Sequence, residues 1–170
     1  MLKNKTFTKS EILEQINSIN FIFRKSRSAY PYLADKHIGK TGIVSFDRTE
    51  FHFIQPLSRE TQIETNKIGH FLNQNFIVRL FAVLQYYGIF NNLDEIKYKR
   101  LTILKGLRNK FGHSLGTYNP ENSKDRKLLQ QMIAVFNLPK KNYKDFPISV
   151  DTVINSVIQE AKQYVKEHYR

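Results

Sequence analysis

The 170-residue sequence contains no cysteine and no tryptophan. The lack of thiols excludes disulfide bonds, thiol catalysis and zinc held by cysteine. Long apolar runs are also missing: the most apolar stretch, from Phe76 to Phe90, is shorter than the roughly 18 residues that a membrane span needs, and it carries Arg79. The first residues lead into no apolar segment of the kind found in signal peptides. We therefore expect a cytoplasmic protein that does not enter a membrane.

Acidic side chains are scarce relative to basic ones. The sequence has 27 Lys and Arg against 15 Asp and Glu, which gives a formal net charge of +12 at pH 7. Such an excess favours polyanionic partners, with nucleic acid first and an anionic membrane surface second. Many small proteins are basic without binding nucleic acid, so the charge is compatible with an RNA partner but does not establish one.

Patterns typical of metal sites, nucleotide loops and serine hydrolases are absent as well. His37, His52, His70 and His168 do not show the spacing of two ligands on one helix face. The sequence has neither a phosphate-binding glycine loop nor a serine nucleophile elbow. We therefore expect no metal and no cofactor.

Apolar residues make up 41 % of the chain and repeat at helical spacing in five segments. The length fits one domain with a real core. Residues 31–57 are irregular, although Ile43–Phe46 and Phe51–Ile54 can pair as a hairpin. The pattern predicts an all-α, four- to five-helix bundle that forms a single domain over 1–170, with a small irregular or hairpin insertion at 31–57. The expected helices run from about 8 to 29, 58 to 87, 92 to 112, 123 to 136 and 150 to 168.

The first two of these helices carry distinctive signals. Thr8 and Glu11 form the pattern of a capping box at the start of the first helix. The middle of the second helix, from Phe71 to Leu84, is apolar nearly all round. Such a helix is either the central helix of a bundle or one that also faces a partner subunit.

The most informative segment is Arg108 to His113, at the end of the third expected helix. At about 100° per residue, Arg108 lies within about 40° of both Leu101 and Leu104, and therefore within an apolar stripe. A guanidinium there is costly unless it is paired or meets an anion. Gly112 predicts the end of the helix, and five residues of rise bring His113 to about 7.5 Å from Arg108 along the axis.

Both side chains can then reach one phosphate, which a guanidinium grips with two bonds while an imidazole takes or gives a proton. RNA supplies its own nucleophile, the 2′-hydroxyl, so this chemistry needs no metal. The simpler alternative is that Arg108 complements the helix dipole and His113 is an ordinary surface residue.

The sequence Arg-Asn-Lys-Phe-Gly-His at 108–113 resembles the signature of the HEPN family: an Arg, usually followed by a polar residue, then a His after four to six intervening positions. The order of the helices over about 58–168 is similar too. The resemblance implies a metal-independent ribonuclease that cuts RNA by 2′-hydroxyl attack and leaves a cyclic phosphate. It also implies a homodimer in which two motifs line one cleft. His113 would be general base or acid, Arg108 would hold the scissile phosphate, and Asn109 would orient one of them.

Further residues are expected to bind the substrate. The family often adds a polar or charged residue from the second helix, for which Arg79 is the candidate, with Asn75 one turn earlier in place of the commoner acidic residue. Lys105 and Lys110 neighbour the motif and suit the RNA backbone, and Tyr118 in the following loop can stack on a base. Each has a simpler interpretation: snorkelling for Arg79, a solvated face for the lysines, and packing for Tyr118.

Three functions are compatible with the sequence. The first is a homodimeric RNA endonuclease, acting as a toxin or an antiviral defence effector, with an antitoxin or a regulatory protein as a further partner. The second is a non-catalytic module in which the same cleft holds a nucleotide or RNA, or docks a protein. The third is a structural protein whose apolar second helix binds another subunit. The intact motif favours the first.

Overall fold

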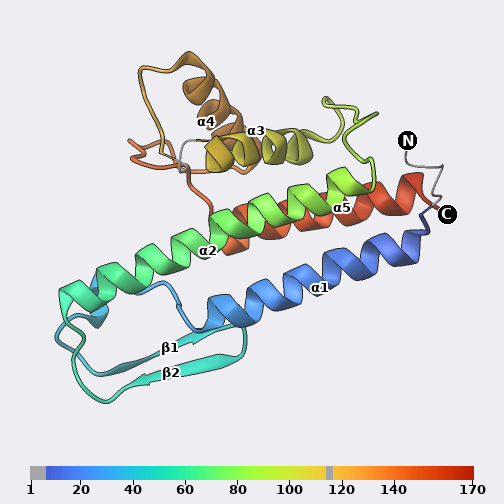
Figure 1. Cartoon of the computed structure of the whole chain (residues 1–170). Helices are drawn as coiled ribbons and strands as arrows, with labels where there is room; N and C mark the ends of the chain where they lie inside the picture. Colours follow the sequence, from blue (N-terminus) through green and yellow to red (C-terminus); the bar gives the residue numbers. More distant parts are fainter. Residues whose placement is uncertain (1–6, 114–116) are drawn as a thin grey trace. The chain divides into compact units, whose positions relative to one another are not determined.

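The computed structural model describes residues 7–113 and 117–170, and the chain is mostly helical with a small two-stranded sheet (Figure 1). It divides into two compact units: unit 2 is Asn20–Asn73, and unit 1 combines the described residues before it with Gln74–Arg170. The helices are α1 (Lys9–Ser28), α2 (Arg59–Tyr86), α3 (Lys99–His113), α4 (Ser123–Val135) and α5 (Asn155–His168). The short elements are η1 (Asp35–His37), β1 (Gly42–Phe46), β2 (Thr49–Phe53) and η2 (Val150–Ile154).

Unit 2 contains a β-hairpin within the segment that the sequence sets apart as an insertion. β1 and β2 pair antiparallel, with Phe46 opposite Thr49. Asp47 and Arg48 form the two-residue turn between them and have φ angles of 47° and 65°, as a type I′ turn requires. The predicted hairpin is therefore confirmed, although its second strand begins at Thr49 and not at Phe51.

The segment between α1 and the hairpin is held by side chains of α2. The buried Leu33 donates its N–H to Asn66 Oδ1 at 2.8 Å, and its carbonyl accepts from Asn66 Nδ2 at 2.9 Å and from Gln62 Nε2 at 3.2 Å. Two amide side chains thus satisfy the backbone groups of Leu33 in the way that a neighbouring strand would. The irregular segment is fixed in this way within unit 2.

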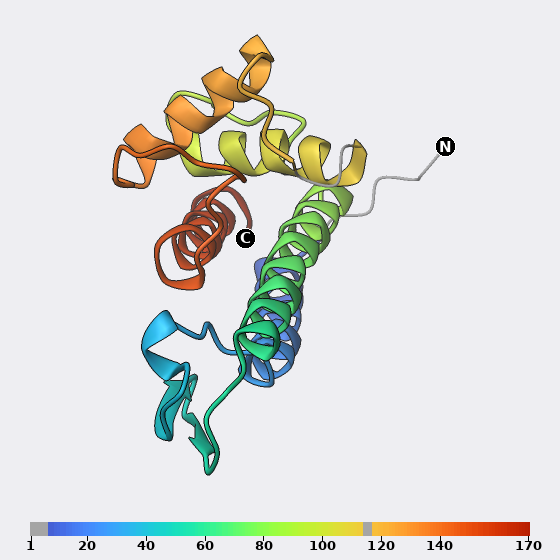
Figure 2. The ribbon, with the colours of Figure 1, turned by 90° about the vertical axis from the view of Figure 1, so that its left-hand side faces the viewer.

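Unit 1 carries the larger core. α3 packs against both α4 and α5, and α3 and α4 lie on the same side of α5 (Figures 1 and 2). The N-terminal half of α1 runs antiparallel to the C-terminal half of α2 (Figure 1). The largest fully buried side chains all belong to this unit: Ile12, Ile16, Ile77, Leu80, Leu84, Ile89, Leu101, Leu104, Leu107, Met132, Phe146 and Ile154.

The first helix begins with the cap that the sequence predicts, and the second begins where it is expected. Thr8 donates its N–H to Glu11 Oε2 at 2.7 Å, and Glu11 donates its N–H to Thr8 Oγ1 at 3.2 Å. This reciprocal pair is the expected capping box. Ser58 Oγ accepts the N–H of Thr61 at 3.1 Å in front of α2. The positions of both helices are confirmed to within one residue at each end.

The predicted start of the third helix is wrong by seven residues. Asp94 Oδ1 accepts the N–H groups of Ile96 and Lys97 at 3.0 Å each, which makes a local turn in place of a helix cap. α3 begins only at Lys99. A π-helical turn that the sequence does not reveal precedes α5, where Ile154 donates its N–H to the Ser149 carbonyl at 3.0 Å.

The apolar middle of α2 is covered on some sides only. Ile77, Leu80 and Leu84 are fully buried, whereas Phe71 and Tyr86 are 60 % and 61 % exposed. The part of the chain that the structure describes contains no helix with the length and apolarity to cross a membrane.

Candidate functional site at the end of α3

The N-terminus of α3 is fixed by a buried carboxylate from α5. Glu160 Oε2 accepts the N–H of Leu101 at 2.8 Å, and Glu160 Oε1 lies 3.4 Å from Arg100 Nη1. Glu160 is 7 % exposed, and Leu101 is fully buried. The first N–H groups of a helix have no partner within the helix and carry partial positive charge. Glu160 therefore caps α3 and ties it to α5.

The C-terminal half of α3 is held by a second buried carboxylate. Lys110 Nζ lies 2.8 Å from Asp125 Oδ2, and Asp125 is 2 % exposed. The same oxygen accepts the N–H of Asn119 at 3.0 Å. This geometry gives Lys110 a structural role between α3 and α4, so its use as an RNA contact stays a prediction that its ion pair disfavours.

Arg108 lies between these two anchors and is half-buried. Its Cζ is 5.3 Å from the centre of the Phe81 ring, which in turn stacks on Phe90 at 4.5 Å. Its Nη1 donates to Asn109 Oδ1 at 3.1 Å. No carboxylate of the described residues lies within 4 Å of this guanidinium. Arg108 thus has an orienting neighbour and an aromatic support, but no counter-charge in this part of the chain.

His113 is the last residue of α3, and its side chain lies outside the described part of the chain. The backbone of Gly112 and His113 is helical, so the predicted helix end at Gly112 is wrong: Gly112 does not adopt the positive φ that ends a helix in this way. The rise between positions 108 and 113 is about 7.5 Å. Whether the two side chains converge stays a prediction.

Arg79 and Asn75 are exposed and lie one turn apart on α2. Positions 79 and 81 are about 200° apart around the helix, and Arg108 stands over Phe81. The structure therefore places Arg79 and Arg108 at different faces of α2 and does not bring them together within this chain.

Lys105 and Tyr118 are engaged with neighbouring side chains. Lys105 Nζ lies 3.4 Å from Glu95 Oε1 in an exposed ion pair, which contributes little to stability and opens easily. The half-buried ring of Tyr118 meets Phe146 edge-on at 5.6 Å. Lys105 keeps its charge near the motif, whereas Tyr118 is packed against the core, which favours the simpler interpretation of that residue.

Glu160 and Asp125 are the residues that the sequence analysis did not single out. Glu160 is adjacent to the apolar stripe of α5 formed by Val157, Ala161 and Tyr164, all buried. A charge beside such a stripe is the same signal that identifies Arg108. Applied to every helix, that criterion would have found Glu160.

Comparison with family models, with curated proteins and with solved structures gave no match. The HEPN resemblance therefore depends on the motif at 108–113 and on the order of the helices. Among the side chains that the structure describes, which leave out those of His37 and His113, no three His, Asp or Glu gather as metal ligands would.

Proposed function

We propose that the protein is a metal-independent RNA endonuclease of the HEPN type, with Arg108, Asn109 and His113 in its active site. The observation that carries the proposal is the state of Arg108. Its guanidinium is supported by Phe81 and hydrogen-bonded by Asn109, and it has no carboxylate partner in the described residues. A phosphate is one of the anions that a planar guanidinium binds with two parallel hydrogen bonds.

The proposed reaction is an in-line attack within the RNA. The 2′-oxygen bonds to the adjacent phosphorus, and the bond from phosphorus to the 5′-oxygen of the next nucleotide breaks. One proton leaves the 2′-hydroxyl and one reaches the departing 5′-oxygen, so the products are a 2′,3′-cyclic phosphate and a 5′-hydroxyl. His113 transfers one of these protons. Arg108, oriented by Asn109, stabilises the charge that develops on the phosphate oxygens.

Two copies of the motif would supply both proton transfers, one imidazole as base and one as acid, so we propose a homodimer as the active form. The exposed apolar side chains on the N-terminal half of α2, Ile63, Ile68 and Phe71, support self-association without defining its geometry. As a toxin or defence effector, the enzyme would also need a controlling partner such as an antitoxin or a regulatory protein.

The test is RNA cleavage in the presence of EDTA. Purified protein should degrade total RNA and leave cyclic phosphate ends, and Arg108→Ala and His113→Ala should each lower the rate by at least about 100-fold. Lys127→Ala, at an exposed position of α4, removes one charge elsewhere and should cleave like the wild type. Light scattering and thermal melting confirm that the variants keep assembly and fold. Cleavage that survives both substitutions would exclude this site.

A second candidate function is phosphate binding without chemistry. A guanidinium held by Asn109 and Phe81 can grip an RNA backbone without any proton transfer. RNA binding that weakens steeply with salt, with no cleavage by wild type, would favour this module. No RNA affinity at low salt would instead favour a protein-interaction role.

A further inference from the structure

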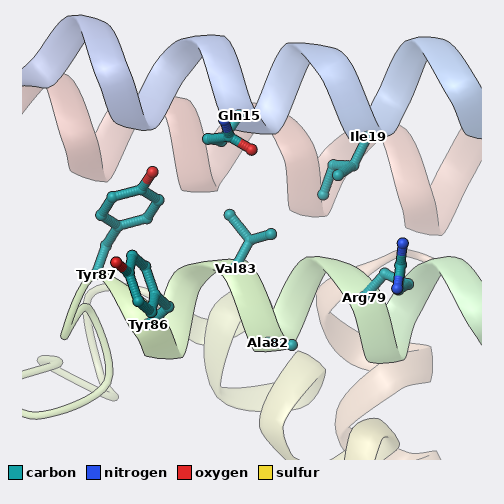
Figure 3. A pocket seen from close by; sticks show the side chains of 7 residues that line it. All are labelled: Gln15, Ile19, Arg79, Ala82, Val83, Tyr86 and Tyr87. Carbon is teal, nitrogen blue, oxygen red and sulfur yellow. The ribbon is translucent and has the colours of Figure 1, made fainter.

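Unit 1 contains a groove between α1 and α2 that is separate from the Arg108 site. It measures about 540 Å³ (Figure 3). Its residues Arg79 and Val83 are each about 200° from Phe81 around α2, so the groove lies on the opposite face of that helix. Its size falls in the range of about 300–1,000 Å³ that is usual for small-molecule sites. The groove is lined by Gln15 and Ile19 of α1, by Arg79, Ala82, Val83 and Tyr86 of α2, and by Tyr87 directly after α2.

One end of the groove is cationic. Arg79 is exposed and extends toward α1 at that end (Figure 3). Within residues 7–113 and 117–170, no carboxylate lies within 4 Å of its guanidinium. Ile19 of α1 and Val83 of α2 line the groove beside it. An exposed arginine beside apolar side chains, with no internal partner there, suits an oxyanion such as phosphate or carboxylate.

The other end of the groove is aromatic. Tyr86 is 61 % exposed, and its ring is held at 5.1 Å from Tyr87 and at 5.4 Å from Phe7. A ring that is fixed by its neighbours but still open to solvent is a platform on which a planar base can stack. Gln15 faces the tyrosines from α1 (Figure 3), and its amide can both donate to and accept from the edge of a base.

The charges around the aromatic end predict how a ligand is oriented in the groove. Burial is the main cause that raises the pKa of Tyr87 above its usual value, followed by Glu11, Tyr86 and Glu14. The negative charges of Glu11 and Glu14 on α1 disfavour a phosphate at the tyrosines and favour the amino groups that adenine, guanine and cytosine carry. An anionic group is therefore expected at Arg79 and an amino-bearing ring at Tyr86.

We propose that this groove binds one nucleotide unit, with its phosphate on Arg79 and its base on Tyr86. The two positions are separated by two helical turns, or about 10.5 Å, which suits a ligand whose anion and ring lie at opposite ends better than it suits a small inorganic anion. The unit is either a free nucleotide or one residue of a single strand, since both offer the same phosphate and base. The site goes beyond the proposed nuclease activity and does not depend on it.

The test is calorimetric titration with AMP, adenosine and inorganic phosphate. AMP should bind more tightly than either fragment. Arg79→Gln should weaken AMP about tenfold or more and leave adenosine unchanged. Tyr86→Leu should weaken both AMP and adenosine about fivefold or more, and Tyr86→Phe, which keeps the stacking ring, should restore binding. Lys127→Gln removes an equal charge from α4 and should bind AMP like the wild type. The positions changed in these variants are exposed, so each is expected to melt like the wild type.

A second arm identifies the source of the nucleotide. The tetranucleotide (dA)4 lacks 2′-hydroxyls and resists the proposed cleavage. If it binds far more tightly than AMP and remains sensitive to Arg79→Gln, the groove holds a strand; if AMP binds as tightly, it holds a free nucleotide. The proposal is overturned if neither ligand binds at about 10 mM, or if Arg79→Gln and Tyr86→Leu bind AMP like the wild type. His113→Ala should bind AMP like the wild type. AMP binding can therefore be interpreted even if the nuclease proposal fails.

Discussion

Arg27 and Arg108 each place a guanidinium over an aromatic ring, Phe46 at 5.5 Å and Phe81 at 5.3 Å. The two guanidinium groups differ in their exposure to solvent. Arg27 is 5 % exposed, and burial lowers its pKa. Arg108 is half-buried and open to a ligand. In unit 2, Arg27 Nε donates to Asn73 Oδ1 at 3.1 Å while its buried Nη1 has no hydrogen-bond partner among the described residues. The difference in solvent exposure assigns Arg27 to the fold and leaves Arg108 accessible to the ligand that we propose.

Gly69 is the residue that makes room for Arg27. A Cβ at position 69 would lie 2.6 Å from Arg27 Cζ, so Gly69→Ala must push the guanidinium away from Asn73 and Phe46. We expect a loss of about 1–2 kcal/mol in the free energy of unfolding, since a buried hydrogen bond to a charged group is lost or strained. Urea denaturation followed by circular dichroism measures it.

The matched control is the same substitution in an Arg27→Ala background. The three heavy atoms nearest to that Cβ all belong to the Arg27 guanidinium, so without it Gly69→Ala should cost less than about 0.5 kcal/mol. An equal loss in both backgrounds would show that the close approach of Arg27 is not the cause.

At the residue scale, the sequence identified Arg108 but not Arg27 or Glu160. All three are charges on or beside apolar stripes, and Arg27 continues the series Ile16, Phe23 on α1 at helical spacing. The stripe criterion is therefore sufficient to find buried charges. What sequence cannot supply is the partner, because Asn73 and Leu101 come close to these charges only through tertiary packing.

At the scale of elements, long-range contacts determine where α3 begins more than its local sequence does. The sequence predicts a helix start at about residue 92, yet the Asp94 carboxylate closes a turn there, and the helix starts where Glu160 can accept the N–H of Leu101. The local capping pattern sufficed for α1 because its partner is three residues away. α3 was misplaced because its cap comes from a residue 59 positions distant in sequence.

Glu160→Ala tests this cap directly. It should lower the free energy of unfolding by about 2–3 kcal/mol, because the buried N–H of Leu101 loses its acceptor and Arg100 loses its ion pair. Glu160→Gln keeps an acceptor and should lose roughly half as much. Chemical denaturation of both variants gives the values. Glu121→Ala, an exposed carboxylate on the loop before α4, serves as the reference and should change stability by less than about 0.5 kcal/mol. If Glu160→Ala is as stable as that reference, the cap does not hold α3.

At the scale of the whole molecule, the helical class and the hairpin follow from periodicity, but the division into two units does not. The boundary falls inside α1 and α2, at Asn20 and Asn73, where the helical pattern continues without a break. Periodicity reports the faces of a helix and not which neighbours cover them. The charge of +12 can likewise be counted from the sequence. That Arg108 and Arg79 lie at different faces of α2 can be seen only in the folded chain.

The end of the chain is joined to the segment before α3 by a cluster of polar side chains. Lys97 Nζ lies 2.7 Å from Glu167 Oε2, which also accepts the Tyr98 hydroxyl, and Gln163 Nε2 donates to Glu167 Oε1 at 2.8 Å. Hydrogen bonds from Lys97, then from Tyr98 and Gln163, lower the pKa of Glu167 to about 2. The native state therefore favours the ionised carboxylate.

Because this pKa lies below its ordinary value of 4.5, the cluster stabilises the fold fully above about pH 4.5 and loses its contribution as the pH falls toward 2. Glu167→Gln should melt below the wild type at pH 5, and the two melting curves should converge near pH 2. Circular dichroism melts between pH 2 and 5 measure the difference, with Glu121→Gln as a carboxylate of equal charge outside the cluster. A gap between wild type and Glu167→Gln that stays constant over this range would mean that the carboxylate acts by packing, without any contribution from its ionisation.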